Sequence, residues 1–271
     1  MFRAFQHLSL LVLISLLLAI PQTGSVTQPF TWWISSPLEK VRPWDSPKLS
    51  AKAVELFAGR NEFEPFQIVV RAETKDLTGV DIEVSDLRSS EGFQIAKSNI
   101  TVYFESFMNL DRASTVEGSA GLWPDPLIPR TDRYADERRN AFPFTVPRGC
   151  NQPLWIEVFV PETAPPGSYT GSATVSLDGP ARFTVPIHLT VWQFVLPSTA
   201  SLKSSFGLSG INALKQHRGR YTNEKDLHSI TRLYAKAALL HRISIHGGSM
   251  VPPRGVFEAG RMHVDWRAYD E

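Results

Sequence analysis

The sequence contains a single cysteine, Cys150, so no disulfide can form within the chain. The fold must therefore be held together by side-chain packing. No general base stands beside Cys150 in the stretch PRGCNQPLW, and a thiol without such a neighbour is typical of a small buried residue. We expect Cys150 to be structural rather than reactive.

The sequence also lacks a charge bias. Its 28 Lys and Arg residues nearly balance its 27 Asp and Glu residues, and no run of five basic residues occurs. This argues against nucleic acid, membrane surfaces and polyanions as partners. No His-x-x-x-His spacing is present, so the sequence predicts no metal site and no cofactor.

Long apolar runs are missing except at the start of the chain, where Leu8 to Ile20 is apolar and follows Arg3. About 13 apolar residues are fewer than the roughly 20 that span a bilayer. Pro21 and the small residues Thr23 and Ser25 complete the pattern of a secretory signal peptide at residues 1–25. We expect a secreted or periplasmic protein without a membrane segment after cleavage, while an uncleaved anchor stays open.

An alternating pattern dominates from residue 54 to residue 194. FQIVVRA places Phe66, Ile68 and Val70 on one face, and the runs at 169–177 and 183–191 alternate in the same way around an Asp-Gly-Pro turn. Further strands are expected at 80–84, 100–104 and 155–160. Short antiparallel strands with one apolar face predict a β-sandwich, with Pro186 at an edge or bulge.

The pattern changes after Leu196-Pro197. Residues 203–208 read as a strand, Leu227 to Leu240 have helical spacing after a cap at Thr222 or Asn223, and RISIHGG reads as a second strand. Strand, helix and strand predict parallel pairing. About 25 residues follow His246, too few for another crossover, so we expect the natural chain to continue.

Five stretches together resemble one family. They are SPLEKV (36–41), GRNEFEPFQIVV (59–70), GLWPDPLIP (121–129), QPLWIEVFVPETAPPGSYTG (152–171) and LTVWQFVLP (189–197). In this order they resemble the N-terminal domain of glycoside hydrolase family 123 and its uncharacterised relatives, the domain of unknown function 4091 group. The resemblance implies a mostly β fold: an antiparallel β-sandwich at 26–197, followed at 198–271 by the incomplete start of a (β/α)8 barrel.

The resemblance also implies a function, that of retaining, exo-acting β-N-acetylgalactosaminidases. In those enzymes an aspartate orients the 2-acetamido group of the substrate, and the adjacent glutamate is the general acid and base. Neither Asp136-Glu137 nor Asp270-Glu271 matches that pair, so no catalytic residue is assigned. The expected partners are a glycan with terminal N-acetylhexosamine and the remainder of the barrel. The alternative is a non-catalytic secreted β-sandwich that binds glycan or protein.

Three residues are candidates for substrate binding. His246 would stand at the carboxyl end of a barrel strand, followed by Gly247-Gly248, where such barrels place their active sites. Trp123 and Asp125 lie in GLWPDPLIPR, where an indole face and a carboxylate suit a sugar.

The favoured interpretation of GLWPDPLIPR is nevertheless a stiff loop that plugs a core with Trp123, Leu127 and Ile128, because its three prolines restrict the backbone. Tryptophans in strands are most often buried. We therefore expect the remaining candidates for an aromatic platform, Trp32, Trp33 and Trp192, to lie in the core.

Overall fold

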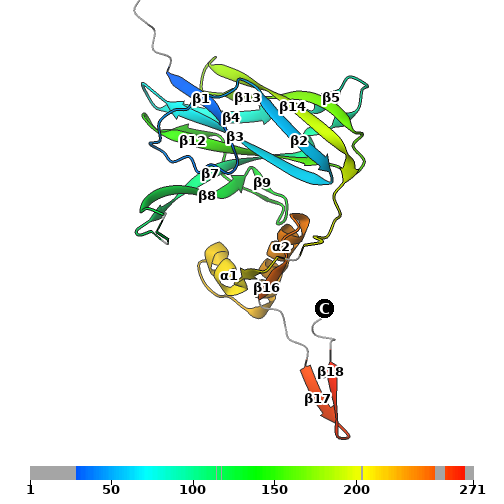
Figure 1. Cartoon of the computed structure of the whole chain (residues 1–271). Coiled ribbons are helices and arrows are strands. Elements are labelled where there is room, and N and C mark those ends of the chain that lie inside the picture. Colours follow the sequence, from blue (N-terminus) through cyan, green and yellow to red (C-terminus); the bar gives the residue numbers. More distant parts are fainter. Residues whose placement is uncertain (1–28, 114, 117, 203, 248–253, 266–271) are drawn as a thin grey trace, which may run out of the picture.

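The computed structural model describes residues 29–113, 115–116, 118–202, 204–247 and 254–265, and these are mostly β (Figure 1). The predicted signal peptide, Gly248 and the Asp270-Glu271 pair lie outside the described residues.

Two sheets make up the larger part of the structure. The five-stranded sheet has the order β1 (Phe30–Ser35), β3 (Glu62–Ala72), β12 (Asn151–Val160), β7 (Ile100–Leu110) and β8 (Gly121–Pro129), and all of its pairs are antiparallel. The seven-stranded sheet has the main order β11 (Phe144–Val146), β4 (Leu77–Val84), β13 (Gly167–Ser176), β14 (Arg182–Val195) and β2 (Val54–Arg60). The short strands β5 (Leu87–Ser89) and β6 (Gln94–Ile95) extend it beside β13, and the 3-10 helix η1 (Lys97–Asn99) leads from β6 into β7.

One hydrophobic core joins the two sheets. Phe66, Ile68 and Val70 of β3 belong to the same buried cluster as Val185 and Leu189 of β14. Alternate residues of a strand point to opposite faces, so this cluster confirms the periodicity predicted for both segments. Trp33 is also buried, as predicted, but Trp192 is 45% exposed, so its predicted core position is wrong.

Two features of the seven-stranded sheet refine the prediction. β2 pairs with β14 in parallel, so the expectation of purely antiparallel strands is wrong at this edge. The pairing with β2 begins at Ile187, one residue after Pro186. Pro186 therefore pairs only with β13. Because no strand pairs with it on the other side, its lack of a backbone N–H breaks no hydrogen bond to β2.

Gly171 fills a position on the inward-facing row of β13 where no side chain fits. A Cβ at this position would lie 2.5 Å from Leu87 Cδ2 and 2.9 Å from the carbonyl oxygen of Asp86. The Asp86 carbonyl belongs to the backbone next to β5 and cannot turn away as a side chain can. Close contact between β13 and the chain around β5 therefore depends on this glycine.

We expect Gly171→Ala to lower the free energy of unfolding by about 1–3 kcal/mol, because the added methyl forces the backbone of β5 away from β13. Urea denaturation followed by circular dichroism measures the change. Ser168→Ala, on an exposed position of the same strand, is the matched control and should change stability by no more than about 0.5 kcal/mol. Equal stability of the two variants would contradict the close packing at Gly171.

The stretch GLWPDPLIPR forms the edge strand β8, so the prediction of a loop is wrong. Its prolines are tolerated because an edge strand donates to one neighbour only. Ile128 packs against the core, whereas Leu127 is exposed, so the plug is confirmed for one of the two aliphatic residues. Trp123 is half-buried on the outer side of the sheet.

The C-terminal part contains the predicted strand, helix and strand. β15 (Phe206–Leu208) and β16 (Ile245–Gly247) pair in parallel, and α2 (Glu224–Leu240) lies between them in the sequence. Asn223 caps α2 by accepting from the Asp226 N–H at 2.9 Å. One helix and one hairpin of this part were not predicted: helix α1 (Gly210–Arg218) and the hairpin of β17 (Arg254–Glu258) and β18 (Arg261–Asp265).

His241 and Arg242, which follow α2, contact β3 and the residues next to β2 and β14, on the side where Figure 1 shows α1 and α2. The Arg242 guanidinium donates from Nε to the Pro197 carbonyl oxygen at 2.7 Å and from Nη2 to the Asn61 carbonyl oxygen. The His241 ring lies against Phe63, with 4.3 Å between ring centroids. Burial lowers the pKa of His241, and the nearby Arg133 and Arg242 lower it further.

We expect Arg242→Ala to loosen the helical part without unfolding the sheets, because both bonds to the sheet side are lost together. Limited proteolysis should then cut the connection between residues 197 and 209 several times faster than in the wild-type chain, while circular dichroism of the sheets is unchanged. Arg220→Ala, an exposed arginine between α1 and α2, serves as control. Unchanged cutting in Arg242→Ala would contradict the anchoring role.

Candidate functional site

A groove of about 390 Å³ lies at the edge of the five-stranded sheet. Its wall comes from β7, β8, the turn between them and the segment that follows β1. The lining residues are Lys40, Met108, Leu110, Gly118, Ser119, Trp123, Pro124 and Asp125. Trp123 and Asp125, the two predicted residues of GLWPDPLIPR, therefore share one groove.

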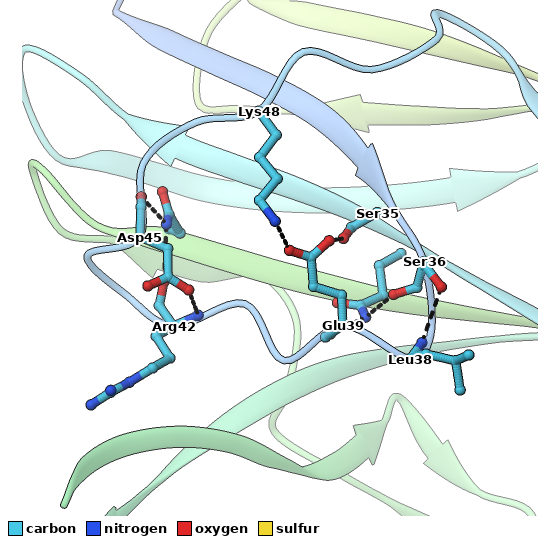
Figure 2. A network of polar contacts seen from close by, with 9 residues as sticks. Ser35, Ser36, Leu38, Glu39, Arg42, Asp45 and Lys48 are labelled. Atoms are coloured by element: carbon cyan, nitrogen blue, oxygen red, sulfur yellow. Dashed lines mark hydrogen bonds and ion pairs between the residues drawn. The ribbon is translucent and has the colours of Figure 1, made fainter. Parts of the chain in front are cut away.

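Residues 36–50, here called the covering segment, cross the outer face of the five-stranded sheet. Figure 2 shows the polar network that shapes it. Glu39 accepts from Ser35 Oγ at 2.7 Å and pairs with Lys48, and Asp45 accepts from the Arg42 N–H at 2.7 Å. The hydrogen bonds from Lys48 and Ser35 lower the pKa of Glu39, so its carboxylate stays charged and the network intact near neutral pH.

Two buried amides of the sheet hold the covering segment in place. Gln67 Nε2 donates to two carbonyl oxygens of the segment at 2.8 Å each. Asn151 Nδ2 donates to two more at 2.9 and 2.8 Å. Val41 packs on Trp33 and Val69 beneath the segment, which buries a second, smaller cluster on the outer face. This attachment positions Lys40 and Arg42 beside β8.

Trp123 has a fixed orientation. Its Nε1–H donates to the Ser119 carbonyl oxygen at 2.7 Å, and the Arg42 guanidinium lies 4.7 Å from the ring centroid. Arg42 itself donates to the carbonyl oxygens of Leu122 and Ala120 at 3.0 and 3.1 Å. A guanidinium over an indole face is attracted by the electrons of the ring. One face of Trp123 is thus covered by the protein.

Gly121 makes this arrangement possible. Its φ is +110°, and a Cβ there would stand 2.6 Å from Arg42 Nη2. Any other residue would be strained and would also displace the guanidinium.

Three charged groups meet at one end of the groove. Lys40 Nζ lies 3.8 Å from Asp125 Oδ1 and 3.8 Å from Glu105 Oε1. Asp125 is open to solvent, with 71% of its side chain exposed, whereas the Glu105 side chain is only 1% exposed. Glu105 stands at a register shift between β7 and β8. Its Oε2 has no hydrogen-bond partner among the described residues.

Burial raises the pKa of Glu105, Lys40 partly offsets this, and Asp125 adds a smaller increase. A raised pKa means that the folded state binds the proton more tightly than the unfolded chain. Stability from this group therefore falls as pH rises from about 4.3, the ordinary value, through the folded-state value.

We expect Glu105→Gln to raise the free energy of unfolding at pH 7.5, where the wild-type chain buries a charged carboxylate, and to have little effect at pH 4. Urea denaturation at both pH values measures this. Asp125→Asn, which removes an exposed carboxylate beside the same lysine, should stay within about 0.5 kcal/mol of wild type at both. A destabilised Glu105→Gln at pH 7.5 would contradict the assignment of Glu105 as an electrostatic cost.

His246 stands apart from this groove. It lies on β16 opposite Gly207 of β15, and its side chain is exposed. A Cβ on Gly207 would come within 3.7 Å of the imidazole Cε1, so the ring leans over the neighbouring strand. Gly247 has a φ of +79°, which permits a sharp turn directly after the histidine. His246 is not among the residues that line the groove of Trp123 and Asp125.

A second cavity of about 240 Å³ lies between the hairpin of β9 (Thr131–Asp132) and β10 (Glu137–Arg138) and the helices α1 and α2. Arg139 pairs there with Asp132 at 2.8 Å and with Glu137 at 2.6 Å. The Glu137 carboxylate is thus paired with an arginine. Such a pairing favours the charged carboxylate, whereas a catalytic acid must hold a proton.

Other features add no further site. Cys150 is free and half-buried against the core. Among the described residues there is no group of three or more His, Cys, Asp or Glu side chains arranged to hold a metal ion. No helix in the described part of the chain is long and apolar enough to span a bilayer.

Sequence reasoning missed Lys40, Arg42 and Glu105. Glu105 directly follows the strand predicted at 100–104, and nothing in its local sequence indicated that its side chain would be buried. The only signal was the position of Lys40 and Arg42 within and beside SPLEKV, one of the stretches that carry the family resemblance.

No curated protein sequence matches the chain. A family 123 glycoside hydrolase from Clostridium perfringens, whose structure was reported with the details of glycolipid glycan hydrolysis, superposes with a TM-score of 0.63 at 17% identity. The superposition covers 89% of this chain and 44% of that one, so this chain spans less than half the length of that enzyme.

Two further structures resemble the chain only weakly. They are a PapD-like domain of human CEP192 and the fimbrial subunit MyfA from Yersinia enterocolitica. The first has 14% identity and a TM-score of 0.28 over 71% of this chain and 100% of that one. The second has 9% identity and a TM-score of 0.26 over 60% of this chain and 97% of that one. Neither bears on function.

The family model of the glycoside hydrolase 123 N-terminal domain matches residues 39–177, which include the covering segment from Glu39 onward, Glu105, Trp123 and Asp125. Because the matched residues make up more than half of the 271, the chain belongs to the glycoside hydrolase 123 N-terminal domain family.

Proposed function

We propose that this chain is the N-terminal region of an exported glycoside hydrolase that removes terminal N-acetylhexosamine from a glycan. Its two sheets act as a β-sandwich, and β15, α1, α2 and β16 act as the opening of a (β/α)8 barrel. The observation that carries the proposal is the groove of Trp123 and Asp125 within a domain of a glycoside hydrolase family. An aromatic ring beside polar groups is the usual composition of a sugar site.

The chemistry of this proposal is retaining and substrate-assisted. An aspartate would orient the 2-acetamido group of the substrate, and an adjacent glutamate would transfer protons. We propose that this pair lies in the part of the enzyme that the 271 residues do not span, because Asp136-Glu137 lies on the β9–β10 hairpin, where Arg139 holds Glu137. His246, at the carboxyl end of β16, is the described residue best placed to contact substrate in the barrel.

Export follows from the sequence of residues 1–25, which we propose are removed as a signal peptide after Ser25. The mature protein would then act outside the cytoplasm, in the periplasm or the medium, where it meets polymeric or lipid-linked glycans. Cleavage can be checked by N-terminal sequencing of the protein recovered from the periplasm or the culture medium.

A second candidate function is a non-catalytic module that binds glycan. It is favoured by one observation: Trp123 and Asp125 come from β8 and Lys40 from the covering segment, so the groove needs nothing from the barrel. In this case the chain alone binds a sugar, and no hydrolysis accompanies binding.

An assay with a chromogenic β-N-acetylgalactosaminide distinguishes the two functions. We expect no release of product by the 271-residue chain, and release by the protein expressed from the gene read through the codons that follow Glu271. Activity of the shorter chain would contradict the placement of the catalytic pair. An immediate stop codon, or an inactive longer protein, would leave the module as the better description.

A further inference from the structure

The charged end of the groove holds donors and acceptors that no described group satisfies. Lys40 Nζ is 3.8 Å from each of two carboxylate oxygens, which exceeds the 2.7–3.2 Å of an N–H···O hydrogen bond. Its three N–H groups thus make no hydrogen bond to another described residue. The Asp125 carboxylate, likewise, accepts no hydrogen bond from a described residue.

The signs of these charges restrict the ligand. Lys40 is flanked by Asp125 and by the buried Glu105, so an anion such as a phosphate or a sulfate would meet two carboxylates. A cation would meet Lys40 and the Arg42 guanidinium that covers Trp123. A neutral ligand that both accepts and donates hydrogen bonds avoids both repulsions, and hydroxyl groups do this.

The neighbouring aromatic ring restricts the class of ligand further. Trp123 lines the same groove as Lys40 and Asp125, and the Ser119 carbonyl and Arg42 hold its ring in one orientation before any ligand arrives. A pyranose has an apolar face of C–H groups and an equator of hydroxyls. It can therefore stack on the indole while its hydroxyls reach the charged pair.

We propose that this groove binds one pyranose ring of a glycan through two adjacent hydroxyls. One hydroxyl accepts from Lys40 and the other donates to Asp125, while the ring stacks on Trp123. The inference rests on the proposed function only in taking a glycan as the ligand. It adds that the groove recognises a pair of neighbouring hydroxyls. It also assigns Lys40, which was not among the residues predicted from the sequence, as the hydrogen-bond donor to one of them.

Titration of the full chain with methyl β-D-galactopyranoside tests the site. Binding is followed by isothermal calorimetry and by the indole N–H resonances in nuclear magnetic resonance spectra. We expect saturable binding with a dissociation constant in the millimolar range, typical of one ring with few contacts. The 3-deoxy and 4-deoxy glycosides separate the two hydroxyls, and loss of one charged hydrogen bond should weaken binding about tenfold.

Three variants and a matched control complete the experiment. Lys40→Met, Asp125→Asn and Trp123→Ala should each raise the dissociation constant about tenfold or more. Lys75→Met, at an exposed lysine in the turn between β3 and β4, should leave it unchanged. Thermal denaturation of each variant identifies any loss of folding, and for such a variant the comparison is repeated with Trp123→Phe or Lys40→Gln. Inorganic sulfate should not displace the sugar.

Three results would overturn the inference: no saturable binding by the wild-type chain, equal affinity of Lys40→Met and wild type, or displacement of the sugar by sulfate. Hydrolysis by the longer protein is scored separately. Hydrolysis without binding in the groove would reject this site and leave the proposed enzyme standing. Binding in the groove without hydrolysis would reject the enzyme and leave this site standing.

Discussion

The attachment of the covering segment to the outer face of the five-stranded sheet is the constraint on which the site depends. Four hydrogen bonds from the amides of Gln67 and Asn151 satisfy carbonyl oxygens of a segment that has no regular structure. A buried carbonyl without a partner is costly, so these amides make the burial of the segment favourable. Once the segment is held, Val41 covers Trp33 and Val69, and that face of the sheet has its own small core.

The same attachment creates the electrostatics of the groove. Lys40 and Arg42 are separated by one residue and serve different purposes. Arg42 turns toward β8 and orders Trp123, whereas Lys40 projects between an exposed carboxylate and a buried one. The Glu105 side chain is almost fully buried, and Lys40 offsets only part of the electrostatic cost of that burial. Natural proteins tend to retain such unfavourable groups where function needs them.

The parts of the fold that the sequence predicted follow from local periodicity. A few neighbouring residues determine each of these parts: the alternation of Phe66, Ile68 and Val70, the hairpin between β13 and β14, and the cap of α2 at Asn223. Parallel pairing of β2 with β14 could not be predicted in this way, because it joins segments more than a hundred residues apart. The exposed position of Trp192 likewise depends on what the rest of the chain leaves uncovered.

The local structure predicted around Trp123 and Asp125 was wrong, because a loop was expected where the structure has an edge strand. Trp123 and Asp125 do line one groove, but they do so from an edge strand, and their partner Lys40 comes from a segment about eighty residues earlier. His246 lies elsewhere, on β16. No pattern within GLWPDPLIPR indicates that Arg42 will lie over its indole, since that contact exists only after the covering segment has been laid across the sheet.

The position of Arg42 has one more consequence. Because the guanidinium occupies one side of the indole, only the opposite side is left for stacking, and a ligand cannot be clamped between two aromatic walls. A pyranose bound there as proposed would therefore present only one of its two faces to an aromatic ring of this groove.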